Sequence, residues 1–345
     1  MTDTHAKSRT LKLIWPLLLL VVIIVVVTGG AAIHLSRFYH TPQGDPDFTI
    51  IYTISRGQSF NTTARQLTQA GLCTSETKLR FVATLLGLDK KIKAGEYRLS
   101  GSMTPEAILT VLTSGRVHLR RITIPEGYTV KQIAEVVEKS GLGKAGHITD
   151  LCFSEPFIRR MDLPDGAPSL EGYLFPETYL FEKATTEEAI LTAMVERFKA
   201  VFTQELQQDG NALGLTPNQV VTLASIIEKE TGAPFERPVI SSVFHNRLKK
   251  RMRLETDPTV IYGIKDFNGN ITRKDLRRRT PYNTYVIKGL PPGPIASPGL
   301  AALTAAVRPD DTPYLYFVSK KDGSHHFSRN LREHNKAVRK YQLRR

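Results

Sequence analysis

Cysteine is scarce in this 345-residue chain, which contains only Cys73 and Cys152. Two cysteines so far apart lack the spacing of a metal site, and a chain of this size does not need a disulfide framework. The two could form a disulfide in an oxidising compartment or could be small residues of a core. The sequence leaves both possibilities open and argues against a cysteine-rich scaffold.

Charged residues are absent from positions 13–36, and nearly all of Ile14–Val27 is aliphatic. About 20 apolar residues in a helix cross a bilayer core of roughly 30 Å. Residues 13–36 are therefore predicted to form a transmembrane anchor. A cleaved signal peptide is the alternative, favoured by the small residues at 28–32, although its apolar region usually has only about 7–15 residues.

A short basic segment, residues 1–12, precedes the apolar run and carries Lys7, Arg9 and Lys12. Short basic flanks tend to remain in the cytoplasm. We therefore expect residues 1–12 to be a cytoplasmic stub of a single-pass protein of the inner (cytoplasmic) membrane. The rest of the chain is then expected on the outer side of that membrane.

Acidic residues are few relative to basic ones: the chain has 33 Asp and Glu and 47 Lys and Arg, which gives a net charge of +14. Such a surplus favours polyanionic partners, or it is simply a solvated basic surface. Nucleic acid is the usual polyanion for a cytosolic chain, and the predicted topology argues against it. Phospholipid head groups and cell-wall polymers are the polyanions available outside the membrane.

An internal repeat follows the apolar run, because Ile54–Ser59 is echoed seventy residues later by Ile124–Thr129. Each copy is predicted to form a short strand, a turn at the shared glycine and an amphipathic helix. The shared Ser or Thr is placed to cap the start of that helix, and Gly71 or Gly141 to end it.

This repeat, over residues 48–160, resembles the LysM pattern, a βααβ module that binds glycans containing N-acetylglucosamine. The resemblance implies a second helix at 74–87 and a strand at 95–99 in the first copy. The alternative is a structural spacer, since repeats need only bury their faces against one another.

A turn-rich segment, Pro164–Pro168, separates the repeat region from the C-terminal half of the chain. Glu171–Tyr179 then combines several aromatic residues with two acids. Aromatic faces and carboxylates suit the recognition of sugar rings, although aromatics at this spacing also form cores. We expect a separate catalytic domain at residues 165–345.

The strongest helix start in the chain lies at Thr216. Thr216 is placed to cap the helix, Pro217 suits the first helical position, and Gln219 completes a capping box. The predicted helix continues through the aliphatic residues after Gln219 and ends near Thr231.

Two glutamates lie in the last turn of this predicted helix. Glu230 extends the bulky apolar stripe, whereas Glu228 lies about 160° away around the helix axis. A carboxylate beside apolar residues is partly desolvated, which raises its pKa toward the value that a general acid needs. The alternative is that both glutamates are solvated at a frayed helix end.

The remaining residues predict short elements joined by long loops that are rich in Asn, Thr and Tyr. Such loops suit the lining of a ligand site. The expected elements are a helix at 235–252, a short helix begun by Asp257–Pro258, a helix begun by Ser297–Pro298, and a hairpin of strands at 314–319 and 324–328.

Several strings of this sequence are similar to the endolytic murein transglycosylase family. They lie at residues 171–179, 224–231, 242–248, 252–263, 282–285, 289–293, 314–318 and 334–335. The basic run Arg277–Arg279 departs from the family pattern. The resemblance implies an α+β chain: a transmembrane helix, a LysM-like α/β region, and a mainly helical lytic transglycosylase domain with a small β-sheet.

The resemblance also implies a function and a catalytic residue. Such an enzyme cleaves nascent peptidoglycan strands between N-acetylmuramic acid and N-acetylglucosamine near the membrane, forms 1,6-anhydromuramyl ends, and limits strand length. Glu230 matches the catalytic acid of the family, and no cofactor or metal is implied. Asn246, Thr256, Asn283 and Tyr285 are our candidates for binding the substrate.

The implied partners are peptidoglycan glycan strands and inner-membrane lipid, with peptidoglycan synthases as a further hypothesis. Glu255 and Asp257 are rival second carboxylates. A carboxylate about 5–9 Å from Glu230 would support a lysozyme-like hydrolase, although Asp257 is expected to cap the short helix that it begins. A non-catalytic wall-binding scaffold is another alternative.

A metal centre built from His325, His326 and His334 is disfavoured. Adjacent residues of a strand point to opposite faces, and no further ligands at metal-site spacing accompany these histidines.

Overall fold

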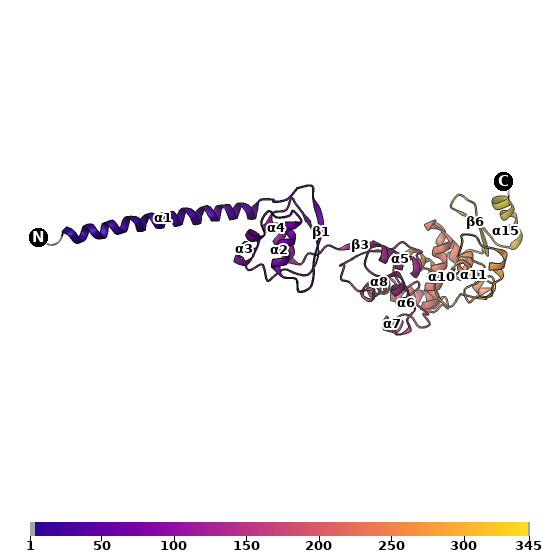
Figure 1. The fold of residues 1–345 in the computed structure, drawn as a ribbon. Coiled ribbons are helices and arrows are strands. Elements are labelled where there is room, and N and C mark those ends of the chain that lie inside the picture. The colour runs from indigo at the N-terminus through magenta and orange to yellow at the C-terminus, as the bar shows by residue number, and fades with distance from the viewer. Residues whose placement is uncertain (1–3, 266, 344–345) are drawn as a thin grey trace. The chain divides into compact units, whose positions relative to one another are not determined.

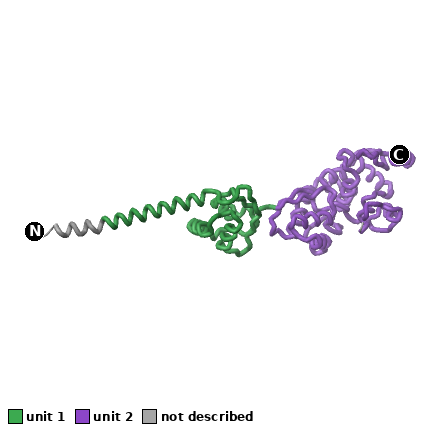
Figure 2. Tube along the Cα trace, turned by 45° about the horizontal axis from the view of Figure 1, so that its top comes forward, with its two compact units in different colours: residues 1–119 green, residues 120–345 purple. Residues whose placement is uncertain are grey.

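The computed structural model describes residues 4–265 and 267–343 (Figure 1). It divides into two compact units, residues 1–119 and 120–345, which Figure 2 colours separately. Residues 1–3 of the expected stub and residues 344–345 of the expected catalytic domain lie outside the described residues. The division falls inside the repeat, whereas the sequence placed a boundary between residues 160 and 165.

Helix α1 (Thr4–His40) contains the apolar run and extends beyond it at both ends. Its segment Trp15–His40 contains an 18-residue stretch with a mean hydropathy of 2.8 and is long and apolar enough to span a membrane. A signal sequence near an N-terminus would satisfy the same criteria.

The end of α1 packs onto the first unit. Phe38 is buried in the core of that unit, and His34 Nε2 lies 2.7 Å from Lys78 Nζ. His40 Nδ1 is also 2.8 Å from a carboxylate oxygen of Glu106. The apolar helix and the first unit are therefore joined by packing as well as by the chain.

The first unit continues as a strand, two helices, a strand and a further helix. These are β1 (Thr49–Ile54), α2 (Phe60–Gln69), α3 (Glu76–Leu85), β2 (Gly95–Ser100) and α4 (Pro105–Ser114). Strands β1 and β2 pair antiparallel, with Tyr52 opposite Tyr97. The predicted second helix and closing strand of this copy are present, within two residues of their expected bounds or closer.

The second copy of the repeat lies at the start of the second unit. It comprises β3 (Arg120–Thr123), α5 (Val130–Lys139), α6 (Ala145–Phe153), α7 (Glu155–Arg160) and β4 (Thr178–Phe181). Strand β3 pairs antiparallel with β4, with Ile122 opposite Tyr179. The closing strand of this copy is therefore supplied by the segment that the sequence had assigned to the catalytic domain.

The predicted features shared by the two copies are confirmed. Ser59 accepts a hydrogen bond from Thr62 N at the start of α2, and Thr129 forms a full capping box with Gln132 at the start of α5. Gly71 and Gly141, which follow the two helices, have φ angles of 74° and 71°. This left-handed conformation ends a helix and favours glycine.

The segment Glu171–Tyr179 packs inside the second unit. Tyr173 is fully buried, and Glu171 accepts a hydrogen bond from Val130 N at 3.0 Å. Burial raises the pKa of Glu171 to about 8. This aromatic segment therefore contributes to the core and to the repeat.

The rest of the second unit is mainly helical. It comprises α8 (Glu187–Val201), α9 (Gln204–Ala212), α10 (Pro217–Glu230), η1 (Pro234–Glu236), α11 (Arg237–Lys249), α12 (Asp257–Tyr262), α13 (Arg273–Arg277), α14 (Leu300–Val307), β5 (Tyr316–Ser319), β6 (His325–Ser328), α15 (Leu331–Val338) and η2 (Arg339–Leu343). Strands β5 and β6 form the predicted hairpin sheet. The helix expected from residue 297 begins three residues later.

The two cysteines lie in different cores. Cys73 packs in the first unit and Cys152 in the second, and both are buried free thiols. Burial raises the pKa of the Cys73 thiol to about 12. They therefore act as small core residues in this structure.

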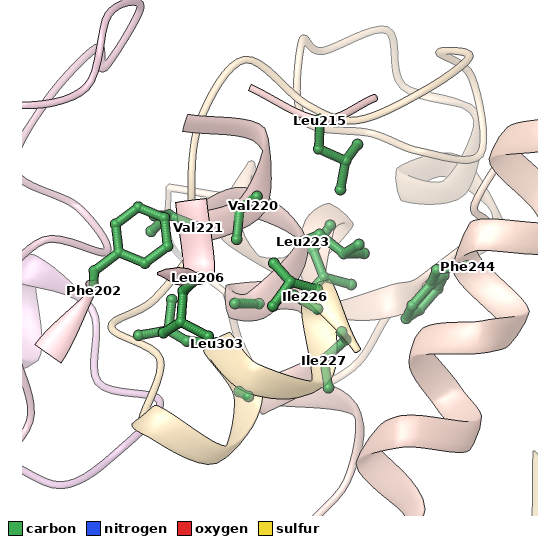
Figure 3. Close-up of a cluster of buried hydrophobic side chains, with 14 of the residues drawn as sticks. Phe202, Leu206, Leu215, Val220, Val221, Leu223, Ile226, Ile227, Phe244 and Leu303 are labelled. Atoms are coloured by element: carbon green, nitrogen blue, oxygen red, sulfur yellow. The ribbon is translucent and has the colours of Figure 1, made fainter. Parts of the chain in front are cut away.

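Helix α10 lies at the centre of the largest core cluster (Figure 3). Its side chains meet Phe244 of α11 and Leu303 of α14. All residues from Val220 to Ile227 are buried. Because these residues are covered on every side, they do not reach solvent, whereas the C-terminal turn of the helix does: Lys229 is exposed, and Glu228 and Glu230 are partly exposed.

Candidate active site

The start of α10 is fixed by the predicted capping box. Gln219 N donates to Thr216 Oγ1 at 3.3 Å, and Thr216 N donates to Gln219 Oε1 at 2.9 Å. Pro217 occupies the first helical position. This start sets the register of the helix and so determines which side each glutamate of the last turn faces.

Glu228 is a structural residue. Its Oε1 accepts a hydrogen bond from Arg237 Nη2 at 2.8 Å, and its Oε2 accepts one from Gly299 N at 3.0 Å. The Glu228 and Arg237 side chains are only 6% and 9% exposed. This ion pair joins the end of α10 to the starts of α11 and α14, so Glu228 is not the solvated residue of a frayed helix.

Glu230 faces a cavity of about 410 Å³. Its side chain is partly exposed, and its carboxyl accepts a hydrogen bond from Thr256 Oγ1. Burial among protein atoms raises its pKa to about 7, and the negative charge of Asp257 acts in the same direction. The bond from Thr256 opposes this shift because it stabilises the ionised carboxylate.

The cavity is lined by residues from five parts of the second unit, in addition to Glu230. They are Val243, Arg247, Leu254, Glu255, Asp257, Tyr285, Leu315, Tyr316, Phe317, Leu331, His334 and Asn335. The lining therefore combines three carboxylates, one guanidinium and several aromatic rings.

Asp257 does not cap helix α12, and that prediction is wrong. Thr256 occupies the cap position, but its hydroxyl bonds to Glu230 and gives α12 no side-chain cap. The carboxylate of Asp257 instead accepts a hydrogen bond from Tyr285 Oη at 2.7 Å. Asp257 and Tyr285 therefore form a pair on the cavity wall beside Glu230.

The turn before α12 places Thr256 next to Glu230. Glu255 has a φ of 52°, which is uncommon for a residue other than glycine. Glu255 N donates to Thr284 O at 3.3 Å, and Thr256 N donates to Thr284 Oγ1 at 3.0 Å. Thr284 thus holds a strained turn of the kind that clusters at functional sites.

Arg247 connects several residues of the cavity lining. Its Nε donates to Leu315 O at 2.7 Å, and its Nη1 lies 3.1 Å from Glu255 Oε2. The guanidinium carbon also lies 4.9 Å from the centre of the Tyr316 ring. The Tyr316 ring stacks in turn on His334, with centroids 5.1 Å apart.

The four predicted binding residues have different environments. Thr256 and Tyr285 lie beside Glu230 and Asp257, as described above. Asn246 Nδ2 donates to the carbonyls of Thr312 and Tyr314, at 2.6 and 3.0 Å. Asn283 is 1% exposed and its amide donates to three backbone carbonyls. These two asparagines are absent from the cavity lining: Asn246 holds the segment before β5, and Asn283 holds the end of α13 and the residue after it.

Sequence reasoning did not single out Arg247 or Tyr316 as site residues, and it considered His334 only as a ligand of the disfavoured metal centre. They come from α11, β5 and α15, which are distant in the sequence, so no local pattern joins them. Their only signal was their position within the strings 242–248, 314–318 and 334–335 that resemble the family.

The histidines of the disfavoured metal centre are separated. His325 Nδ1 lies 2.6 Å from Glu236 Oε2, whereas the His326 ring neighbours Tyr341 and His334 lines the cavity. Within residues 4–265 and 267–343, no three His, Cys, Asp or Glu side chains are grouped as metal ligands would be.

Comparisons with known proteins identify the family of the chain. The sequence profile of the YceG-like family matches residues 52–340 of this chain. The chain belongs to the YceG-like family. It is 35% identical over 327 residues to an endolytic murein transglycosylase of Bacillus subtilis, covering 90% of each chain. The resemblance drawn from the sequence is therefore confirmed.

Two further relatives were found. An endolytic murein transglycosylase of Streptococcus pneumoniae is 30% identical over 284 residues, which are 72% of this chain and 50% of the relative. The crystal structure of a YceG-like protein from Listeria monocytogenes matches with a TM-score of 0.60 and 33% identity, covering 84% of this chain and 98% of that one.

Substitutions of the two glutamates of α10 are expected to have opposite effects on stability. Glu228→Gln leaves Arg237 with a weakened buried partner and should lower the free energy of unfolding by about 3 kcal/mol. Glu230→Gln removes a carboxyl whose pKa is raised from 4.5 to about 7. Because that carboxyl binds its proton more tightly in the folded state, its ionisation destabilises the fold progressively between these two pH values.

Thermal unfolding of the full chain in detergent, at pH 4 and pH 8, tests this. Glu230→Gln should unfold at a higher temperature than the unsubstituted chain at pH 8, with little difference at pH 4. Glu228→Gln should unfold at a lower temperature at both pH values. Equal loss of stability in the two variants at pH 8 would contradict the distinction drawn between them.

Proposed function

We propose that this chain is a membrane-anchored lytic transglycosylase that cleaves peptidoglycan strands, with Glu230 as its acid and base. Family membership supports the enzyme class. The observation that carries the residue assignment is the position of Glu230. It lies at the end of a buried helix, faces the cavity, and has a pKa raised to about 7.

The first half of the proposed reaction uses protonated Glu230 as a general acid. The proton passes to the glycosidic oxygen between N-acetylmuramic acid and N-acetylglucosamine, and the bond from that oxygen to the muramyl anomeric carbon breaks. The acetamido group of the substrate stabilises the resulting positive charge, so a second carboxylate is not required. A pKa near 7 leaves a useful fraction of Glu230 protonated at neutral pH.

The second half uses the ionised carboxylate of Glu230 as a general base. The muramyl 6-hydroxyl attacks the anomeric carbon and its proton returns to Glu230. The product is a 1,6-anhydro ring formed without water. Thr256 then has a positioning role, because its hydroxyl holds the carboxylate in place and stabilises its ionised form.

The other residues that line the cavity offer both apolar and polar groups for binding the sugar. The stacked rings of Tyr316 and His334 offer a surface for the apolar face of a sugar. Tyr285 and Asp257 present polar atoms beside Glu230. Asn246 and Asn283, our other candidates, would act indirectly by holding the loops of the site.

The remainder of the chain supports a location beside the membrane. We propose that α1 is a single-pass anchor in the inner membrane with the catalytic unit outside the cytoplasm. The two copies of the repeat, with two helices between their strands in the first and three in the second, are proposed to bind glycan as LysM-like modules. Anchoring restricts cleavage to newly made strands and so limits their length. Peptidoglycan synthases are the partners that this location would bring nearby.

A lysozyme-like hydrolase is the second candidate. Asp257 lines the same cavity and its charge raises the pKa of Glu230. A second carboxylate near the acid is the arrangement that hydrolytic glycosidases use. The two candidates differ in their products, because hydrolysis leaves reducing ends whereas transglycosylation leaves anhydro ends.

Substitution of Glu230 tests the assignment of the acid. The full chain in detergent should convert uncrosslinked glycan strands to fragments with 1,6-anhydromuramyl ends, identified by mass spectrometry. Glu230→Gln keeps the shape of the side chain but cannot supply the proton, so it should reduce cleavage by about 100-fold or more.

Asp257→Asn and Glu255→Gln are the matched controls, since each neutralises another carboxylate of the same cavity. Both should retain anhydro products. Reducing-end products from the unsubstituted chain, lost in Asp257→Asn, would favour the hydrolase instead. Undiminished cleavage by Glu230→Gln would reject Glu230 as the acid.

The pH dependence of cleavage tests the titration of Glu230. The first step needs the protonated acid, so kcat/KM should fall as pH rises through about 7. Thr256→Val removes a hydrogen bond that lowers this pKa, and the fall should therefore move to higher pH. Thr222→Val, which removes a buried hydroxyl of α10 bonded to Asn218 O, should leave the profile unchanged. A Thr256→Val profile that stays in place or moves to lower pH would contradict this role.

Release from the anchor tests the role of α1. An exported form that lacks residues 1–36 should still cleave strands in solution, because the cavity lies wholly in the second unit. In cells whose own copy is deleted, it should fail to restore the normal distribution of glycan strand lengths. Normal strand lengths with the untethered form would contradict the proposed control by anchoring.

A further inference from the structure

Helix α3 in the first unit exposes an apolar surface that its own core does not use. Phe81 and Leu85 are 58% and 69% exposed, and Leu86, at the end of the helix, is 48% exposed. The core side of the helix is already formed by Leu79, Val82 and Ala83, which are buried. We call Phe81, Leu85 and Leu86 the α3 face.

The α3 face adjoins α1. Phe81 and Leu85 follow Lys78 by three and seven residues, so the three side chains share one side of the helix. Lys78 Nζ lies 2.7 Å from His34 Nε2 and 5.6 Å from the centre of the Phe38 ring, both in α1. The apolar side chains of α3 therefore lie on the side of the helix that meets α1.

This contact falls where α1 would leave a bilayer. A hydrocarbon core of roughly 30 Å takes about 20 helical residues. Counted from the start of the charge-free run at residue 13, the core would end near Ile33, which is 59% exposed. His34 and Lys78, the α3 residue that contacts it, would then lie at the level of the lipid head groups.

The net charge of the segment that contains α3 suits an anionic surface. Residues 76–93 contain five basic and two acidic side chains, and Lys90, Lys91 and Lys93 are exposed. Apolar residues on one side of a helix, with lysines beside them, are typical of helices that lie in a membrane interface. Each basic residue near an anionic membrane surface contributes about 1 kcal/mol to binding.

We propose that the α3 face inserts into the head-group region of the bilayer beside α1, in contact with anionic phospholipid. The first unit is then bound to the membrane at two places, the spanning helix and α3. Two contacts fix the orientation of the first unit on the membrane surface, because the second contact prevents rotation of the unit about the axis of the spanning helix. The inference rests on the proposed anchoring of α1.

A fluorescent probe on the α3 face tests this in the full chain. Cys73 and Cys152 are buried, with thiol pKa values raised by burial, so a cysteine introduced on the surface can be labelled selectively. Phe81→Cys, labelled with an environment-sensitive dye, is reconstituted into vesicles of phosphatidylcholine and phosphatidylglycerol. Brominated acyl chains quench a dye only when lipid reaches it.

Thr53→Cys is the matched control, because Thr53 is an exposed residue of β1. Figure 1 shows strand β1 and helix α3 at opposite sides of the first unit. The dye at position 81 should emit at shorter wavelength in vesicles and lose fluorescence with brominated lipid, and the dye at position 53 should do neither. Leu85→Cys should behave like Phe81→Cys and guards against a local effect of one substitution.

Three results would overturn the inference. A dye at positions 81 and 85 that emits as in water would show that the α3 face stays in solvent. A shift without quenching by brominated lipid would show that protein, such as a second copy of the chain, covers it. Quenching that is equal at positions 53 and 81 would show no preferred orientation. Loss of the full chain from the vesicle fraction would instead reject the anchoring of α1.

Discussion

The burial of helix α10 up to its last turn is the constraint on which the site depends. Because the residues before that turn are buried on every side, the helix cannot shift without disturbing the largest core of the chain. Glu230 is therefore held where its carboxyl is poorly solvated. Holding the carboxyl there lowers the stability of the fold, and the packing of the surrounding core offsets this loss. The result is an acid that can hold its proton near neutral pH.

Glu228 and Glu230 lie two residues apart in this turn, but their carboxylates are in different electrostatic environments because their partners differ. Glu228 meets Arg237 and a backbone amide, so its charge is balanced inside the protein. Glu230 meets a hydroxyl and a neighbouring carboxylate, so its charge is not balanced. Glu230, which forms no ion pair with a cation among the described residues, is the one suited to proton transfer, and the ion pair of Glu228 keeps the helix end in place.

Local patterns in the sequence predicted much of the fold, because caps, turns and helix periodicity act over a few residues. The capping box at Thr216 and the repeated helices are examples. Non-local pairing was harder to predict: β3 pairs with β4 across the expected boundary near residue 160. Residue type suggested Asn283 as a ligand, but type cannot tell whether an amide meets substrate or backbone carbonyls. The strained turn at Glu255 had no sequence signal.

Direct titration of the Glu230 carboxyl tests the central claim of this account. Infrared difference spectra of the unsubstituted full chain and Glu230→Gln isolate the C=O stretch of the protonated acid. That band should be present at pH 6, disappear with a midpoint near pH 7, and be absent from the variant at every pH. A midpoint near the ordinary glutamate value of about 4.3 would show that the carboxyl is fully solvated, and would contradict the account.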